Sequence, residues 1–137
     1  MKISDIIRHL ESIAPVNYQE DYDNSGLICG DAAAECTGVL VSLDCTEDMV
    51  REASEKKCNL IVSHHPLIFR PIRRIDPSSE TGRTLMTAIQ TGITIYAIHT
   101  NLDNILSGVN ATLADRLGLV NREILLPKPD KCPLARD

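Results

Sequence analysis

Residues 61–69 read IVSHHPLIF, an apolar run that ends in two adjacent histidines and a proline. Neighbouring side chains on a strand point to opposite faces of its sheet, so an ordinary core strand has no need for such a pair. The whole chain holds only four histidines in 137 residues. The role of His64 and His65 therefore depends on which other residues the fold brings near them.

Strands and helices alternate on both sides of this run. Residues 60–62 predict a buried strand, and strong apolar segments predict two more, at residues 39–43 and 93–98. Helical patterns separate or follow these strands, at residues 46–57, 79–90 and 107–117. Alternating strands and helices with short links are typical of right-handed crossovers and a parallel sheet.

The N-terminal part of the chain predicts a less regular arrangement. An amphipathic helix ends near Pro15, and residues 20–26 form an acidic stretch whose Asn, Ser and Gly suit a turn. Residues 27–29 predict a short strand. Few residues separate it from the strand at 39–43, which favours an antiparallel pairing of these two.

We therefore expect an α/β fold with three layers, α/β/α, around a mostly parallel, mixed central sheet. This domain should occupy residues 1–125. Residues 126–137, with a proline on each side of Lys128, should form a linker-like tail.

Composition narrows the classes of protein to which the chain can belong. Hydrophobic residues make up 43% and charged residues 24%, as in an ordinary soluble domain. A formal net charge of −5 argues against non-specific binding to nucleic acid or to anionic membranes. No apolar run approaches the roughly 20 residues of a membrane span, and the N-terminus lacks the pattern of a secretory signal. Five cysteines without a C-x-x-C motif indicate reduced thiols and a cytoplasmic protein.

Three histidines and two aspartates come directly after the expected parallel strands. Because the carboxyl ends of parallel strands meet at one edge of a sheet, these side chains should gather there. Imidazole and carboxylate groups are ligands for zinc, iron, manganese or nickel. The five residues are Asp44, His64, His65, His99 and Asp103.

We predict that His64, His65 and Asp103 are metal ligands. Pro66 favours extended backbone at His65, so the two imidazoles can diverge toward two metal ions, and Asp103 can bridge them. His99 is open between a ligand, a residue that positions a ligand and a substrate contact.

Structural roles compete with these assignments. A single buried histidine is most often a hydrogen-bonded core residue, and Asp44 also suits the cap of the following helix. The arginines at positions 70, 73 and 74 either draw an anionic substrate toward the site or form a solvated loop.

Five stretches of the chain carry a resemblance to one family. They read DYDNSGLICG, VLVSLDCT, NLIVSHHPLIFRPIRRI, YAIHTNLD and GVNATLADRLGL, and together they cover nearly the whole chain. In this order they resemble the GTP cyclohydrolase I type 2 homolog family, also called the Nif-three-like or NGG-interacting-factor family. That family usually has Trp where Tyr22 stands.

The resemblance implies a dinuclear metal protein. By it, His64, His65 and Asp103 match metal ligands in the first half of the family pattern, and complete members hold two ions per site and form hexameric rings. We accordingly expect a homo-oligomer. The second half of the family supplies a further His and Glu in an H-x-x-x-E arrangement, which this sequence lacks. We therefore expect weak metal binding or a single ion, and little hydrolase activity from this chain alone.

Two function classes stay open. One is a metal-dependent hydrolase that acts on a nucleotide or another phosphate or amide substrate of unknown identity. The other is a non-catalytic metal-binding scaffold or regulatory interaction protein.

Overall fold

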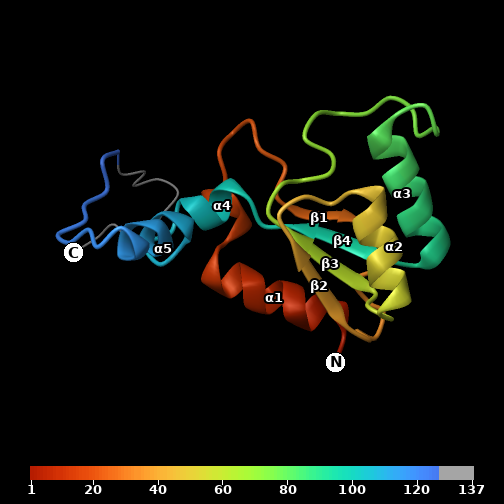
Figure 1. The fold of residues 1–137 in the computed structure, drawn as a ribbon, viewed down its shortest axis with the longest axis horizontal. Helices are drawn as coiled ribbons and strands as arrows, with labels where there is room; N and C mark the ends of the chain where they lie inside the picture. The colour runs from red at the N-terminus through yellow and green to blue at the C-terminus, as the bar shows by residue number, and fades with distance from the viewer. Residues whose placement is uncertain (127–137) are drawn as a thin grey trace.

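The computed structural model describes residues 1–126, which are built around a four-stranded sheet (Figure 1). Its strand order is β1-β4-β3-β2. Strands β2, β3 and β4 run parallel, and β1 is antiparallel to β4. The strands are β1 (Gly26–Cys29), β2 (Val39–Ser42), β3 (Leu60–Ser63) and β4 (Thr94–Ala97).

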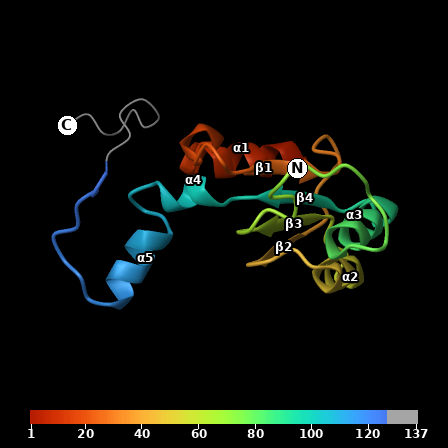
Figure 2. The same ribbon diagram turned by 90° about the horizontal axis from the view of Figure 1, so that it is seen from above.

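Helices lie on both faces of this sheet. Figure 2 shows α1 on one side of the strands and α2 with α3 on the other. The expected three-layer α/β/α fold with a mostly parallel, mixed sheet is thereby confirmed. The helices are α1 (Ile3–Ile13), the 3₁₀ turn η1 (Val16–Tyr18), α2 (Glu47–Glu55), α3 (Glu80–Thr91), α4 (Thr100–Asp103) and α5 (Val109–Arg116).

The two central strands are buried on both faces, which explains why their sequences are continuous apolar runs. Ile61 and Ile95 pack with Val50 of α2 on one face. On the other face, Val62 and Tyr96 lie in a second cluster that includes Ile3, Leu60 and Ile98. This double burial fixes β3 and β4 in register, so that their carboxyl ends leave the sheet side by side.

Local signals set the ends of the helices that connect these strands. The Thr46 hydroxyl accepts a hydrogen bond from the backbone N of Met49 at 3.3 Å and caps α2. The Ser79 hydroxyl does the same for α3, and Gly92 ends that helix in the left-handed region, at φ +69°. The three helices predicted after the strands are found as α2, α3 and α5.

The expected antiparallel pairing of residues 27–29 with residues 39–43 is wrong. Strand β1 pairs with β4, and β2 lies at the opposite edge of the sheet. The connecting residues do not form a hairpin but run along the N-terminus, where the carbonyl of Ala34 accepts from the backbone N of Ile3 at 3.0 Å. Gly30 starts this path at φ +110°, so close to β4 that a Cβ there would lie 2.5 Å from the Cα of Thr94.

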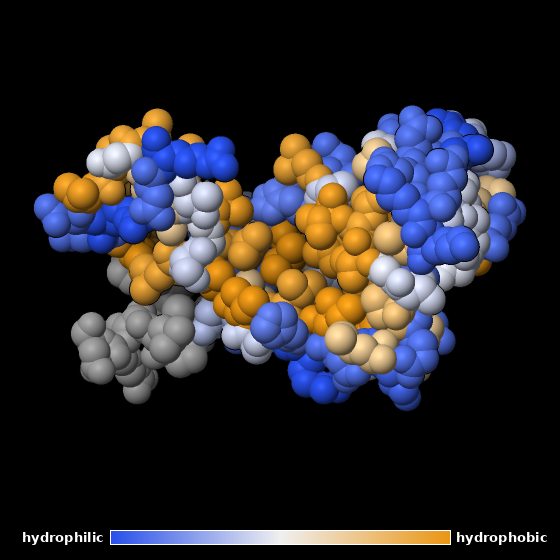
Figure 3. All heavy atoms as spheres, turned by 60° about the horizontal axis from the view of Figure 1, so that its bottom comes forward, coloured by the Kyte–Doolittle hydropathy of each residue, from blue (hydrophilic) through white to orange (hydrophobic). Residues whose placement is uncertain are grey.

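The edge of the sheet at β2 presents apolar surface. Val39 and Val41 of this strand are exposed, as is Leu43 just after it. Figure 3 shows a broad apolar area across the middle of the molecule. Within the described residues, no helix is both long enough and apolar enough to cross a bilayer. Apart from Leu126, the tail expected at residues 126–137 lies outside the described residues.

Candidate metal centre

The predicted site residues lie where β3 and β4 end. His64 and His65 are the first two residues after β3, and His99 is the second residue after β4. Because these strands are parallel neighbours, the two exits place the three rings together. The short helix α4 then carries the chain through one turn to Asp103, its last residue.

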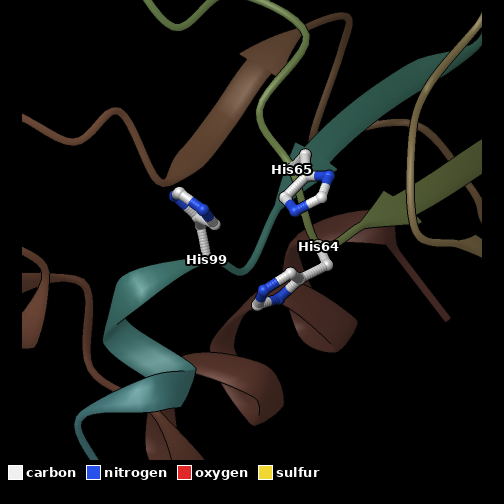
Figure 4. A group of neighbouring side chains, drawn as sticks. All are labelled: His64, His65 and His99. Carbon is white, nitrogen blue, oxygen red and sulfur yellow. The ribbon is translucent and has the colours of Figure 1, made fainter. Parts of the chain in front are cut away.

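The three histidines form a compact cluster. One ring nitrogen of each lies within 4.8 Å of those of the other two, and the ring centroids are 5.1 to 5.5 Å apart. Figure 4 shows the rings of His64, His65 and His99 around a common space. Within residues 1–126, no other group of three or more histidine, cysteine or acidic side chains brings its ligand atoms so close.

Each of the three rings is held through its Nδ1 atom. His64 Nδ1 lies 2.9 Å from the carbonyl oxygen of Ile98, His65 Nδ1 lies 2.8 Å from Asp44 Oδ1, and His99 Nδ1 lies 2.8 Å from Asp23 Oδ1. A carbonyl or carboxylate oxygen only accepts, so Nδ1 is the protonated nitrogen in all three neutral rings. The Nε2 atoms therefore keep their lone pairs, which is the state in which imidazole binds metal.

Asp23 is the residue of the site that sequence reasoning missed. Its side chain is 0% exposed, and its Oδ2 accepts from the backbone N of Thr100 at 3.0 Å, from the Thr100 hydroxyl and from the Ser25 hydroxyl. Burial alone would raise the pKa of Asp23, but hydrogen bonds from Thr100, His99 and the backbone N of Asn24 lower it to about 2. The carboxylate is therefore charged at neutral pH and can act on His99 only as an acceptor.

The sequence offered one signal for this role. Residues 20–26 have the composition of a turn, and their acidic side chains also offer acceptors for a histidine N–H. Asp23 and His99 are 76 residues apart, and β1 brings them together by pairing with β4.

Asp44 accepts a hydrogen bond from His65 and so belongs to the surroundings of the cluster. It does not cap α2, because the cap of that helix is Thr46. Asp103 Oδ1 lies 3.9 Å from His64 Nε2, too far for a hydrogen bond, and Asp103 stands beside the three-histidine group without belonging to it. The structure thus brings His64, His65 and Asp103 to one place, and it groups His99, whose role was left open, with the two histidines. Their role as metal ligands stays a prediction.

The neighbouring cysteine has a different chemistry. Burial, with a smaller contribution from Cys29, raises the pKa of Cys45 to about 12. Its thiol is therefore protonated at neutral pH, which makes it a poor nucleophile.

The chain has relatives that match it over most of its length. Residues 1–134 match the family profile Duf34/NIF3 (NGG1p interacting factor 3). A Clostridium perfringens protein named GTP cyclohydrolase 1 type 2 homolog is 43% identical over 128 residues, which are 93% of this chain and 48% of that protein. The chain thus spans about half the length of this curated relative.

Solved structures agree with the sequence matches. A crystal structure of a Bacillus cereus protein related to NIF3 superposes with a TM-score of 0.88 at 39% identity, and covers 93% of this chain and 36% of that one. A Staphylococcus aureus protein superposes with a TM-score of 0.87 at 43% identity, with the same coverage of both chains. These matches confirm the resemblance seen in the sequence: the chain belongs to the Duf34/NIF3 (NGG1p interacting factor 3) family.

Proposed function

We propose that the chain binds a divalent transition-metal ion at His64, His65 and His99, with Asp103 as a neighbouring oxygen donor, and that the site serves a metal-dependent hydrolase. The observation that carries this proposal is the common state of the three rings. Three separate acceptors fix Nδ1–H in each ring and leave the Nε2 lone pair of each ring free. The three rings also lie together, with one ring nitrogen of each within 4.8 Å of those of the other two.

The residues present fit such an ion. Histidines that bind metals usually donate their other ring N–H to a carboxylate or a backbone carbonyl, and here two carboxylates and one carbonyl accept. Three imidazoles with a nearby carboxylate suit zinc, iron, manganese or nickel. The described residues supply too few donors for two full coordination shells, so we propose one ion per chain.

Such an ion, when bound, lowers the pKa of its water and polarises a substrate oxygen. The protein's own part is to hold the rings in place through Asp23, Asp44 and the Ile98 carbonyl. Asp103, beside His64, offers a carboxylate that can bind the ion or, when it does not, accept a proton from a group held at the cluster. The name of the Clostridium perfringens relative, GTP cyclohydrolase 1 type 2 homolog, supports a nucleotide as the substrate.

Metal analysis of the untagged 137-residue chain tests this proposal. We expect about one zinc, iron, manganese or nickel ion per chain after reconstitution, and at least a ten-fold loss of affinity in His65→Ala and in His99→Ala. His9→Ala is the matched control, because His9 is the fourth histidine and is exposed on α1. Equal affinity in the parent and the His65→Ala protein would refute the site.

The proposed hydrolase activity is tested by a separate measurement of turnover. We expect slow release of product from nucleotide or ester substrates that depends on added metal and stops with a chelator. Stoichiometric metal binding without turnover of any such substrate would instead support the non-catalytic scaffold.

A further inference from the structure

Two aromatic rings stand beside the histidine cluster. We infer that Tyr22 and Phe69 form a binding shelf for a planar, heteroaromatic group of the ligand, such as a nucleobase. The inference rests on the proposed function in one respect: it takes the histidine cluster as the reactive centre beside which the ligand is held.

Aromatic residues are scarce in this chain, and their placement is therefore informative. The sequence contains one Phe, three Tyr and no Trp. Tyr18 and Tyr96 are 6% and 0% exposed and belong to the folded core. The remaining two, Tyr22 and Phe69, are 67% and 43% exposed. Single exposed apolar side chains need no explanation, but here both exposed aromatic rings of the chain meet at one place.

The shelf adjoins the cluster. The ring centroids of Tyr22 and Phe69 are 6.3 Å apart at 62°, and those of Phe69 and His99 are 6.2 Å apart at 86°. These separations lie within the range of favourable aromatic pairs. A ligand ring that lies on the shelf would therefore place the atoms attached to it next to His99.

The shelf is also tied to the cluster through the backbone. Asn24, two residues after Tyr22, donates from its side-chain amide to the carbonyl of Ile68 at 2.7 Å. Asp23, between them, holds His99. One short segment thus fixes the two rings of the shelf relative to each other and relative to the third histidine.

The surroundings favour an anionic ligand with a planar ring over a purely apolar one. Phe69 is followed in its loop by three exposed arginines, and none of them takes part in an ion pair within residues 1–126. Guanidinium groups bind phosphate and carboxylate well, and a base stacks on aromatic faces of any kind. Together the loop and the shelf suit a nucleotide-like molecule. The arginines are at positions 70, 73 and 74.

Paired probes test the shelf on the full 137-residue chain. Guanosine 5′-monophosphate and ribose 5-phosphate share the sugar and the phosphate, and only the first carries a base. By calorimetry we expect the parent to bind guanosine 5′-monophosphate at least about ten-fold more tightly, and Phe69→Leu and Tyr22→Leu each to lose about ten-fold for this probe alone. Ile89→Ala is the control, because it removes an exposed apolar side chain from α3, near the other end of β4.

Other outcomes separate the shelf from the metal site. Equal affinity of the parent for both probes, or unchanged affinity in both leucine variants, would overturn the shelf. Manganese affinity is measured in the same proteins and should stay unchanged in the leucine variants, so a failure of metal binding counts against the proposed function alone. Phe69→Tyr keeps an aromatic ring and should retain the preference for guanosine 5′-monophosphate. This variant shows whether the loss in Phe69→Leu comes from the missing ring or from misfolding caused by a substitution at this position.

Discussion

Asp23→Asn removes one negative charge from a fully buried side chain while keeping its shape. The remaining amide oxygen can still accept from His99 Nδ1, but the amide NH₂ then faces the backbone N–H of Thr100, which is also a donor. The substitution should therefore destabilise the fold, because a buried donor loses its acceptor.

The size of the loss follows from the pKa of Asp23. A lowering from its ordinary value of 3.8 to about 2 corresponds to roughly 2.4 kcal/mol of the free energy of unfolding at pH 7. Because the folded-state pKa is the lower one, this contribution is present above about pH 4 and is lost as the pH falls toward 2. About half of it should remain at pH 3.

Urea unfolding followed by far-UV circular dichroism measures this difference, since the chain has no Trp. The parent and the Asp23→Asn protein are compared from pH 7 to pH 3 in the presence of a chelator. Asp44→Asn is the matched control. Asp44 also accepts from a histidine Nδ1 at 2.8 Å, but its side chain is 62% exposed, so this substitution should lower the free energy of unfolding clearly less. The reasoning would be refuted if Asp23→Asn lowered the free energy of unfolding by no more than Asp44→Asn does. It would also be refuted if the loss in Asp23→Asn were the same at pH 3 as at pH 7.

Three further predictions follow from the packing. Gly30→Ala should lower the free energy of unfolding by about 2 kcal/mol or more, because φ is +110° and the new Cβ would meet Thr94; urea unfolding measures this. Asn101→Ala should lower the free energy of unfolding by about 2 kcal/mol in the same assay, since the buried amide donates to Ala14 O at 2.8 Å and accepts from the backbone N of His99 at 2.9 Å. Cys45 should resist iodoacetamide in the native protein and react once urea unfolds it, as peptide mass spectrometry would show, because its raised pKa leaves almost no thiolate; rapid native labelling would contradict this.

Elements with strong local signals were predictable from the sequence. The continuous apolar runs of β3 and β4 indicated buried strands, and the helical patterns at residues 46–57 and 79–90 placed α2 and α3 close to where the structure has them. Parallel alternation then predicted the edge at which the histidines gather. These inferences depend only on neighbours along the chain and on the general geometry of parallel sheets.

Long-range choices were not predictable in the same way. A hairpin between β1 and β2 looked favourable because few residues separate them, but the path of residues 31–37 is set by contacts with the N-terminus. Helix α4 has four residues, too few for a helical pattern to appear in the sequence. The link between Asp23 and His99 depends on the pairing of β1 with β4, so the error in strand pairing and the missed residue have the same cause.

The segment from Tyr22 to Ser25 has the composition of a turn, but it also connects the two halves of the site. Asp23 holds His99, Asn24 holds the carbonyl of Ile68, and Tyr22 contacts Phe69. Three consecutive residues thus contact the loop after β3 and the loop after β4. A shift of one loop is therefore coupled through this segment to a shift of the other. Metal binding at the histidines and ring binding at the shelf should for this reason influence each other. We expect Asn24→Ala to weaken that mutual effect, measured as the change in manganese affinity on adding guanosine 5′-monophosphate, while leaving the manganese affinity of the ligand-free chain nearly unchanged; a change in that affinity as large as the one in His99→Ala would contradict this account.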